Sequence, residues 1–132
     1  MPELPEVETT LRGISKRIIN KKIESFKSRT QKLRWPIDRD LSRYLKNKII
    51  ISAWRRGKYI IFNLSEGHLL IHLGMSGKLR VFDGQVTPKK HEHWDLSFTD
   101  GWTLRYTDIR KFGALVKICL LYTSPSPRDS IR

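Results

Sequence analysis

The residues best suited to chemistry stand at the start of the chain, in the hexapeptide MPELPE. Removal of Met1 would leave Pro2 as the first residue, with a secondary amine as its terminal nitrogen. An α-amino group titrates near about 7.7–8.0, so a useful fraction of it is neutral and nucleophilic at physiological pH. Such an amine forms a Schiff base with a sugar C1′ or a carbonyl, and the adjacent carboxylate of Glu3 is placed to move protons for it.

The same hexapeptide also has a purely structural interpretation. Pro2 and Pro5 suit the first turn of a helix, where a missing N–H group costs little. Glu3 and Glu6 would then only complement the positive end of the helix dipole. On these six residues alone the structural interpretation is favoured, so the rest of the chain must decide.

A helix is expected to position this terminus. Apolar residues recur three or four positions apart, at Val7, Leu11, Ile14 and Ile18. This spacing predicts a helix over residues 3–19 with one apolar face. Packing of that face would fix the position of the amine, which a loop would not do.

The remainder of the folded chain is expected to form short strands joined by tight turns. We predict strands over residues 22–29, 49–54, 58–64, 68–73, 78–82, 94–99, 102–107 and 114–118. Asp38 can cap a short helix that carries Leu41, Tyr44 and Leu45. Several strands are apolar on both faces. The fold class predicted is therefore mainly β with α: a two-sheet antiparallel β-sandwich with an N-terminal helix and one short additional helix.

Composition points to a nucleic-acid partner. The chain has 26 Lys and Arg against 13 Asp and Glu, a net charge of +13 over 132 residues. Such a field attracts polyanions, and a phosphate backbone is the usual reason for it. No apolar run is long enough to cross a membrane and no signal peptide is evident, so we expect a soluble, cytoplasmic monomer. The single Cys119 excludes an internal disulfide and a cysteine-based zinc site within this chain.

Two regions are expected. Residues 1–118 should form one domain. Residues 119–132 have Ser-Pro repeats and no apolar period, which is typical of an extended or disordered tail.

Six segments carry a further signal when taken together: MPELPEVET (1–9), KLRWP (32–36), RRGKY (55–59), IHLGMSG (71–77), KHEH (90–93) and RYTDIRKFG (105–113). In order and spacing they resemble the formamidopyrimidine-DNA glycosylases, bacterial bifunctional enzymes that excise oxidised purines. The resemblance covers about residues 1–117, the N-terminal domain of that family, and it shifts the balance towards Pro2 as a nucleophile.

The resemblance implies catalytic roles for three residues. Pro2 would attack C1′ of the damaged nucleotide and form the Schiff base. Glu3 would transfer protons during base loss and opening of the sugar ring. Lys58 would act in β-elimination and contact phosphate or base. Without the resemblance, Lys58 is equally well interpreted as a solvated turn residue.

It also implies DNA contacts. Met75, Arg110 and Phe112 would fill the space left by the extruded nucleotide, which offsets a flipping cost of about a few kcal/mol. His91 and Arg110 would contact DNA. His72 would reach a phosphate, although a histidine in its position is more often an ordinary strand residue.

The chain departs from the family after about residue 117. The family continues into a helix-two-turn-helix module and a four-cysteine zinc finger, and neither occurs here. No cofactor or metal is therefore expected in this chain, and we expect a truncated form with reduced or no activity. The expected partner is double-stranded DNA that contains oxidised bases or abasic sites.

Three alternatives stay open at this point. An endonuclease VIII-like enzyme would remove oxidised pyrimidines in place of purines. A non-catalytic basic domain would bind DNA without regard to lesions. A nonfunctional fragment would fail to fold.

Overall fold

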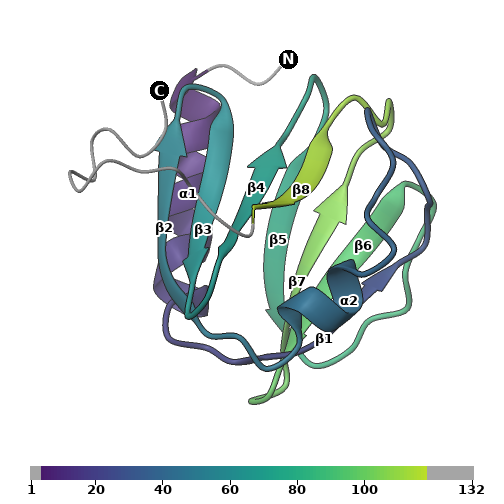
Figure 1. Ribbon diagram of the computed structural model, residues 1–132. Helices are drawn as coiled ribbons and strands as arrows, with labels where there is room; N and C mark the ends of the chain where they lie inside the picture. Colours follow the sequence, from purple (N-terminus) through teal and green to yellow (C-terminus); the bar gives the residue numbers. More distant parts are fainter. Residues whose placement is uncertain (1–3, 119–132) are drawn as a thin grey trace.

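Two four-stranded antiparallel sheets pack face to face in the computed structural model, which describes residues 4–118 (Figure 1). The elements, in chain order, are α1 (Leu4–Ile18), β1 (Ile23–Ser28), α2 (Leu41–Leu45), β2 (Ile50–Arg56), β3 (Tyr59–Leu64), β4 (His68–His72), β5 (Lys78–Asp83), β6 (Glu92–Phe98), β7 (Trp102–Thr107) and β8 (Ala114–Ile118). The predicted fold class is confirmed. Met1, Pro2, Glu3 and the predicted tail of residues 119–132 lie outside the described residues.

The chain crosses between the sheets more than once. One sheet has the strand order β1-β6-β7-β5 and the other β2-β3-β4-β8. The chain therefore changes sheet after β1, after β4 and after β7. The β4–β5 crossing holds Met75, and the β7–β8 crossing holds Arg110 and Phe112. These two crossings form much of the candidate site described below.

The core lies between the sheets. It joins Phe62, Leu69 and Ile71 of one sheet to Trp94, Leu96, Leu104 and Tyr106 of the other, and all of them are fully buried. The rings of Trp94 and Tyr106 stack with centroids 5.5 Å apart. Burial of each large apolar side chain contributes about 1.5–3 kcal/mol, so this layer holds the frame on which the loops are built.

The two helices pack against the edge strands of the sheets. The predicted apolar face of α1 (Val7, Leu11, Ile14 and Ile18) is buried in the core. The α1 helix, which lies against β2 in Figure 1, also contacts β5, and these two strands are edge strands of different sheets. The α2 helix packs on β1. From α2, the Tyr44 hydroxyl donates to the carbonyl of Ile118 and accepts from the amide of His68, each at 3.1 Å. Each helix thus links the two sheets.

An ion pair sets the start of α1 beside the β2–β3 turn. Arg55 Nε, near the end of β2, donates to Glu8 Oε1 at 2.8 Å. The hydrogen bond from Arg55, and then the one from Arg12, lowers the pKa of Glu8. Residues 4–8 therefore lie close to the turn that carries Lys58.

Candidate nucleic-acid interface and active site

Gly74 brings the two sheet crossings into contact. Its φ is +64°, and an added Cβ would lie 2.6 Å from the carbonyl carbon of Phe112 and 2.7 Å from the amide nitrogen of Gly113. Only glycine adopts this backbone conformation without strain and also allows the close approach. The segments 73–77 and 108–113 are thereby packed main chain against main chain.

Asp108 holds the same crossings together from inside. It is fully buried. Its Oδ1 accepts hydrogen bonds from the Ser76 hydroxyl at 2.7 Å and from the Arg110 amide at 3.2 Å. Its Oδ2 accepts from the Tyr106 hydroxyl at 2.6 Å and from the Gly113 amide at 3.0 Å. One carboxylate therefore accepts from both crossings and from β7.

These bonds keep Asp108 ionised. Burial on its own raises the pKa of a carboxyl group. Here the hydrogen bonds from Ser76, Tyr106 and the main chain outweigh burial and lower the pKa of Asp108 below its ordinary value. Burial, together with the hydrogen bond to Asp108, raises the pKa of Tyr106, so its phenol keeps the proton that it donates.

Three of the predicted DNA-contacting side chains lie exposed above this buried support. Met75 and Phe112 are each 44% exposed, and Arg110 Nη1 lies 4.0 Å from the sulfur of Met75. Large apolar side chains exposed on adjacent loops are suited to contact a partner. The structure brings Met75, Arg110 and Phe112 together on supports joined by Asp108.

His72 and Lys58 approach each other at the neighbouring end of β3 and β4. Tyr59, the residue after Lys58, pairs with His72 across the two strands, and their rings meet edge to face at 4.7 Å. His72 Nδ1 accepts from the Gly74 amide at 2.9 Å, so a neutral ring carries its proton on Nε2. Burial, and then the charges of Arg34 and Lys58, lowers the pKa of His72.

His91 reaches the site through the main chain. Its φ of +72° is left-handed, a conformation that costs most residues other than glycine energy. Its carbonyl accepts from the Asp108 amide at 2.9 Å. Segment 89–93 is thereby joined to the two crossings. Of the predicted site residues, Pro2 and Glu3 lie outside the described residues.

Two supporting residues escaped sequence reasoning. Arg34 Nε donates to the Phe112 carbonyl at 2.9 Å, and the Arg34 amide donates to the Gly113 carbonyl, also at 2.9 Å. Asp108 is the other. Both belong to segments that carried the family resemblance, KLRWP and RYTDIRKFG, and that membership was the one available signal. The partners of Arg34, and Ser76 as a partner of Asp108, are more than 30 residues away in the sequence. The nearer partners of Asp108 can be identified only from the folded structure.

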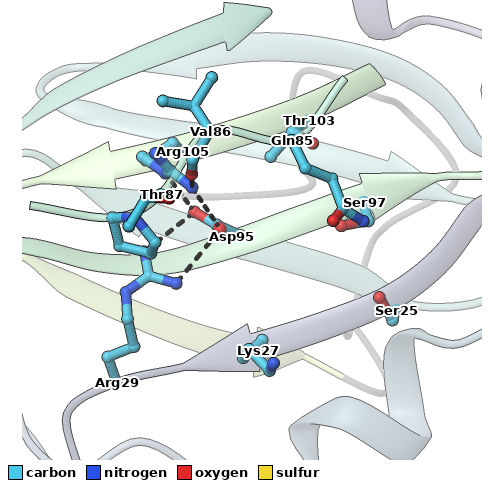
Figure 2. A pocket seen from close by; sticks show the side chains of 11 residues that line it. Ser25, Lys27, Arg29, Gln85, Val86, Thr87, Asp95, Ser97, Thr103 and Arg105 are labelled. Atoms are coloured by element: carbon cyan, nitrogen blue, oxygen red, sulfur yellow. Dashed lines mark hydrogen bonds and ion pairs between the residues drawn. The ribbon is translucent and has the colours of Figure 1, made fainter. Parts of the chain in front are cut away.

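A pocket of about 460 Å³ lies elsewhere, on the outer face of the sheet that contains β1, β6 and β7. Figure 2 shows Asp95 between the guanidinium groups of Arg29 and Arg105. Burial raises the pKa of Asp95, but hydrogen bonds from Arg105 and Arg29 outweigh it and lower the pKa. None of the predicted site residues lines this pocket.

Asp95, Arg29 and Arg105 of this pocket are already paired with one another. Arg105 Nη2 donates to the Val86 carbonyl at 2.6 Å, and Glu92 Oε1 accepts from the Lys89 amide, also at 2.6 Å. The network therefore fastens the segment between β5 and β6, which ends at His91. We interpret this pocket as a support for that segment.

Within residues 4–118 no group of three or more His, Cys, Asp or Glu side chains is arranged to hold a metal ion. Cys119 lies outside the described residues. No helix in the same part of the chain has the length and apolar character needed to cross a membrane.

Comparison with known proteins places this geometry in a family. Residues 1–115 match the family model described as the formamidopyrimidine-DNA glycosylase N-terminal domain. The formamidopyrimidine-DNA glycosylase of Psychromonas ingrahamii is 51% identical over 130 residues, which is 98% of this chain and 46% of the relative. That of Neisseria meningitidis is 51% identical over 120 residues, which is 88% of this chain and 44% of the relative.

Solved structures agree. A MutM complex with DNA containing carbocyclic 8-oxo-G superimposes with a TM-score of 0.81 at 40% identity, over 89% of this chain and 44% of that one. Lactococcus lactis Fpg bound non-covalently to DNA with an AP site gives 0.79 at 38% identity, over 88% and 45%. This chain spans less than half the length of these relatives. It belongs to the formamidopyrimidine-DNA glycosylase family and has the fold of that family's N-terminal domain.

Proposed function

We propose that this chain carries the catalytic domain of a DNA glycosylase with lyase activity that removes oxidised purines such as 8-oxoguanine and formamidopyrimidines from duplex DNA. The observation that carries the proposal is the exposed group of Met75, Arg110 and Phe112 on loops fixed by Asp108. An exposed thioether, guanidinium and phenyl ring are suited to replace a nucleotide that has left the base stack.

The proposed chemistry begins with the amine of Pro2 after loss of Met1. The neutral nitrogen attacks C1′, the C1′–N bond to the damaged base breaks, and the base leaves with a proton. The sugar ring then opens to a Schiff base between the Pro2 nitrogen and C1′. Glu3 transfers the protons for these two steps.

Strand cleavage follows from the Schiff base. Loss of a proton from C2′ with departure of the 3′ phosphate is β-elimination, and loss of a proton from C4′ with departure of the 5′ phosphate is δ-elimination. We assign Lys58 to the first of these steps. The ion pair between Glu8 and Arg55 supports the assignment, because it sets the start of α1 beside the turn that carries Lys58.

Binding is driven by charge and refined by shape. A net charge of +13 supplies sequence-independent attraction to phosphate. His72 and His91 are proposed as contacts to the DNA, each joined to the loops that hold the exposed group. Related proteins bind DNA with carbocyclic 8-oxo-G, with an abasic site and with an oxidised pyrimidine in their solved structures, so preference among lesions is a quantity to measure.

A strand-cleavage assay tests the proposal. The 132-residue chain, with Met1 removed, is incubated with duplexes that contain 8-oxoguanine, thymine glycol or no lesion, beside a Pro2→Gly variant. We expect cleavage at 8-oxoguanine above that at thymine glycol, and loss of cleavage in the variant. Faster cleavage at thymine glycol would favour the endonuclease VIII-like alternative.

A second candidate is a basic domain that binds DNA without chemistry. Its supporting observations are the high charge and the fact that the chain spans less than half of its relatives. It predicts salt-dependent binding that is the same for damaged and undamaged duplexes and indifferent to Pro2.

We further propose residues 1–118 as the folded domain, with residues 119–132 as a separate tail. A cytoplasmic location and a monomeric state stay predictions.

A further inference from the structure

Asp108 is the residue at which all three segments of the candidate interface meet. We propose that it is a positioning residue for lesion recognition, which holds segments 73–77, 89–93 and 108–113 in one arrangement so that Met75, Arg110 and Phe112 act together. This inference rests on the proposed function.

The carboxylate reaches two of the segments directly. Ser76 belongs to the first crossing, and its hydroxyl both donates to Asp108 Oδ1 and accepts from the Arg110 amide at 3.3 Å. Gly113 ends the second crossing and donates to Oδ2. Ser76 and Gly113 are the immediate neighbours of Met75 and Phe112 along the chain, and Arg110 is bonded through its own amide.

The main chain of Asp108 reaches the third segment. Its amide donates to the His91 carbonyl at 2.9 Å. Its own carbonyl lies 2.6 Å from Nε2 of the buried His93. Segment 89–93 is thereby bonded to Asp108 at two points, the His91 carbonyl and the His93 ring, so a shift of residue 108 would move this segment.

Within the described part of the chain, the buried carboxylate of Asp108 is held by hydrogen bonds and not by an ion pair. Among the ion pairs found within residues 4–118, none includes Asp108. A buried charge without such a partner is costly unless hydrogen bonds satisfy it. Here the donors are neutral, and most lie on the interface loops. The anion therefore orders those loops, whereas a packed apolar residue would supply none of these bonds.

Asparagine at this position would keep the size of the side chain and lose an acceptor. Whichever way its amide is turned, an NH₂ group would face donors that now share one oxygen. The Tyr106 and Ser76 hydroxyls can rotate to accept from it. The amides of Gly113 and Arg110 cannot, so Asp108→Asn leaves one of them facing another donor.

The test measures lesion preference in the 132-residue chain. Affinity is measured by fluorescence anisotropy for a duplex with a tetrahydrofuran abasic site and for the same duplex undamaged. A 2-aminopurine opposite the site reports whether the vacated space is filled at saturating protein. The variants are Asp108→Asn and Ser76→Ala. Phe98→Leu is the control, because Phe98 is a buried core residue outside the three segments and its truncation costs stability alone.

We expect Asp108→Asn to lower the ratio of lesion to undamaged affinity by about tenfold or more, as loss of a hydrogen bond to a charged group implies. Ser76→Ala should lower it by about threefold, and both should change the 2-aminopurine signal. Phe98→Leu should keep the ratio within about twofold. Unchanged ratios in both loop variants, or an equal loss in Phe98→Leu, would overturn the inference.

Amide hydrogen exchange separates this inference from the proposed function. Asp108→Asn should expose the amides of Arg110 and Gly113 and leave those of β3 protected. If Asp108→Asn fails to fold, Ser76→Ala provides the same readout for Arg110. If the parent chain shows no lesion preference, the proposed function is refuted. Amide hydrogen exchange in the variants would then still decide whether Asp108 orders the loops. Unchanged loop protection in the variants would contradict that role.

Discussion

Replacing Gly74 with alanine tests whether main-chain contact between the two sheet crossings sets the geometry of the interface. The new Cβ would meet the Phe112 carbonyl carbon at 2.6 Å and the Gly113 amide nitrogen at 2.7 Å. Both are main-chain atoms and cannot rotate away as a side chain could. The segments that carry Met75 and Phe112 must therefore move apart.

The magnitude follows from two contributions. The left-handed conformation at φ +64° costs an alanine about 1–2 kcal/mol, and relief of the overlap adds about 1–3 kcal/mol. In a domain of this size, 1 kcal/mol lowers Tm by roughly 3–6 °C. We therefore expect Gly74→Ala to lower Tm by roughly 10–20 °C, with loss of lesion preference at temperatures where the protein is still folded.

Gly57→Ala is the matched control for melting. Gly57 has φ +59°, close to that of Gly74, but no atom within 4 Å of the added Cβ. Only the conformational cost remains, which is roughly 5 °C. Circular dichroism gives Tm for the three proteins, and anisotropy gives the affinity of the parent and Gly74→Ala for lesion and undamaged duplexes. Equal Tm losses in the two variants, or an intact lesion preference in Gly74→Ala, would refute the reasoning.

Three further predictions concern charge and exposure. Because the pKa values of Asp108 and Asp95 are lowered in the folded protein, the stability that these carboxylates contribute is complete above their unfolded pKa near about 3.9 and is lost as pH falls through the folded pKa values. The Tm should therefore drop below about pH 4, and it should drop less steeply in Asp95→Asn. A parent Tm that stays constant to pH 2 would contradict this. The lowered pKa of His72 leaves its ring neutral at pH 7.5, and a nearby phosphate would raise that pKa. DNA affinity should therefore strengthen from pH 8 to 6, and His72→Gln should lose part of this pH dependence. An identical pH dependence in the parent and the variant would argue against a phosphate contact. Phe112→Ala should weaken lesion binding by about 1–3 kcal/mol and change Tm little because the ring is 44% exposed; a large Tm loss would instead place Phe112 in the core.

Local patterns were sufficient to predict most elements. The apolar period from Val7 to Ile18 predicted α1 to within a residue at each end, and the strands Trp102–Thr107 and Ala114–Ile118 were predicted with the bounds observed.

The predicted cap of α2 was wrong. Asp38 does not cap α2, whose N-cap is Asp40. The Asp38 carboxylate instead accepts from the Asp40 amide, which forms a turn before the helix.

Long-range pairing could not be predicted from the sequence. The pairing of β8 with β4 and of β5 with β7 joins strands far apart in the chain, and apolar period does not encode partner choice. Asp108 illustrates the same limit at the site. In sequence it is a polar residue in a loop, and only the fold reveals that its side chain is buried and that hydrogen-bond donors surround the carboxylate.

The central claim is that the nitrogen of Pro2 attacks the sugar of the damaged nucleotide. Borohydride reduction during reaction with a lesion-containing duplex traps that bond after a single turnover, so even slow activity suffices. Digestion and mass spectrometry then locate the modified peptide. We predict the adduct on the peptide that begins at Pro2. An adduct on Lys58 or another lysine, or lesion cleavage by a chain that still carries Met1, would contradict the account.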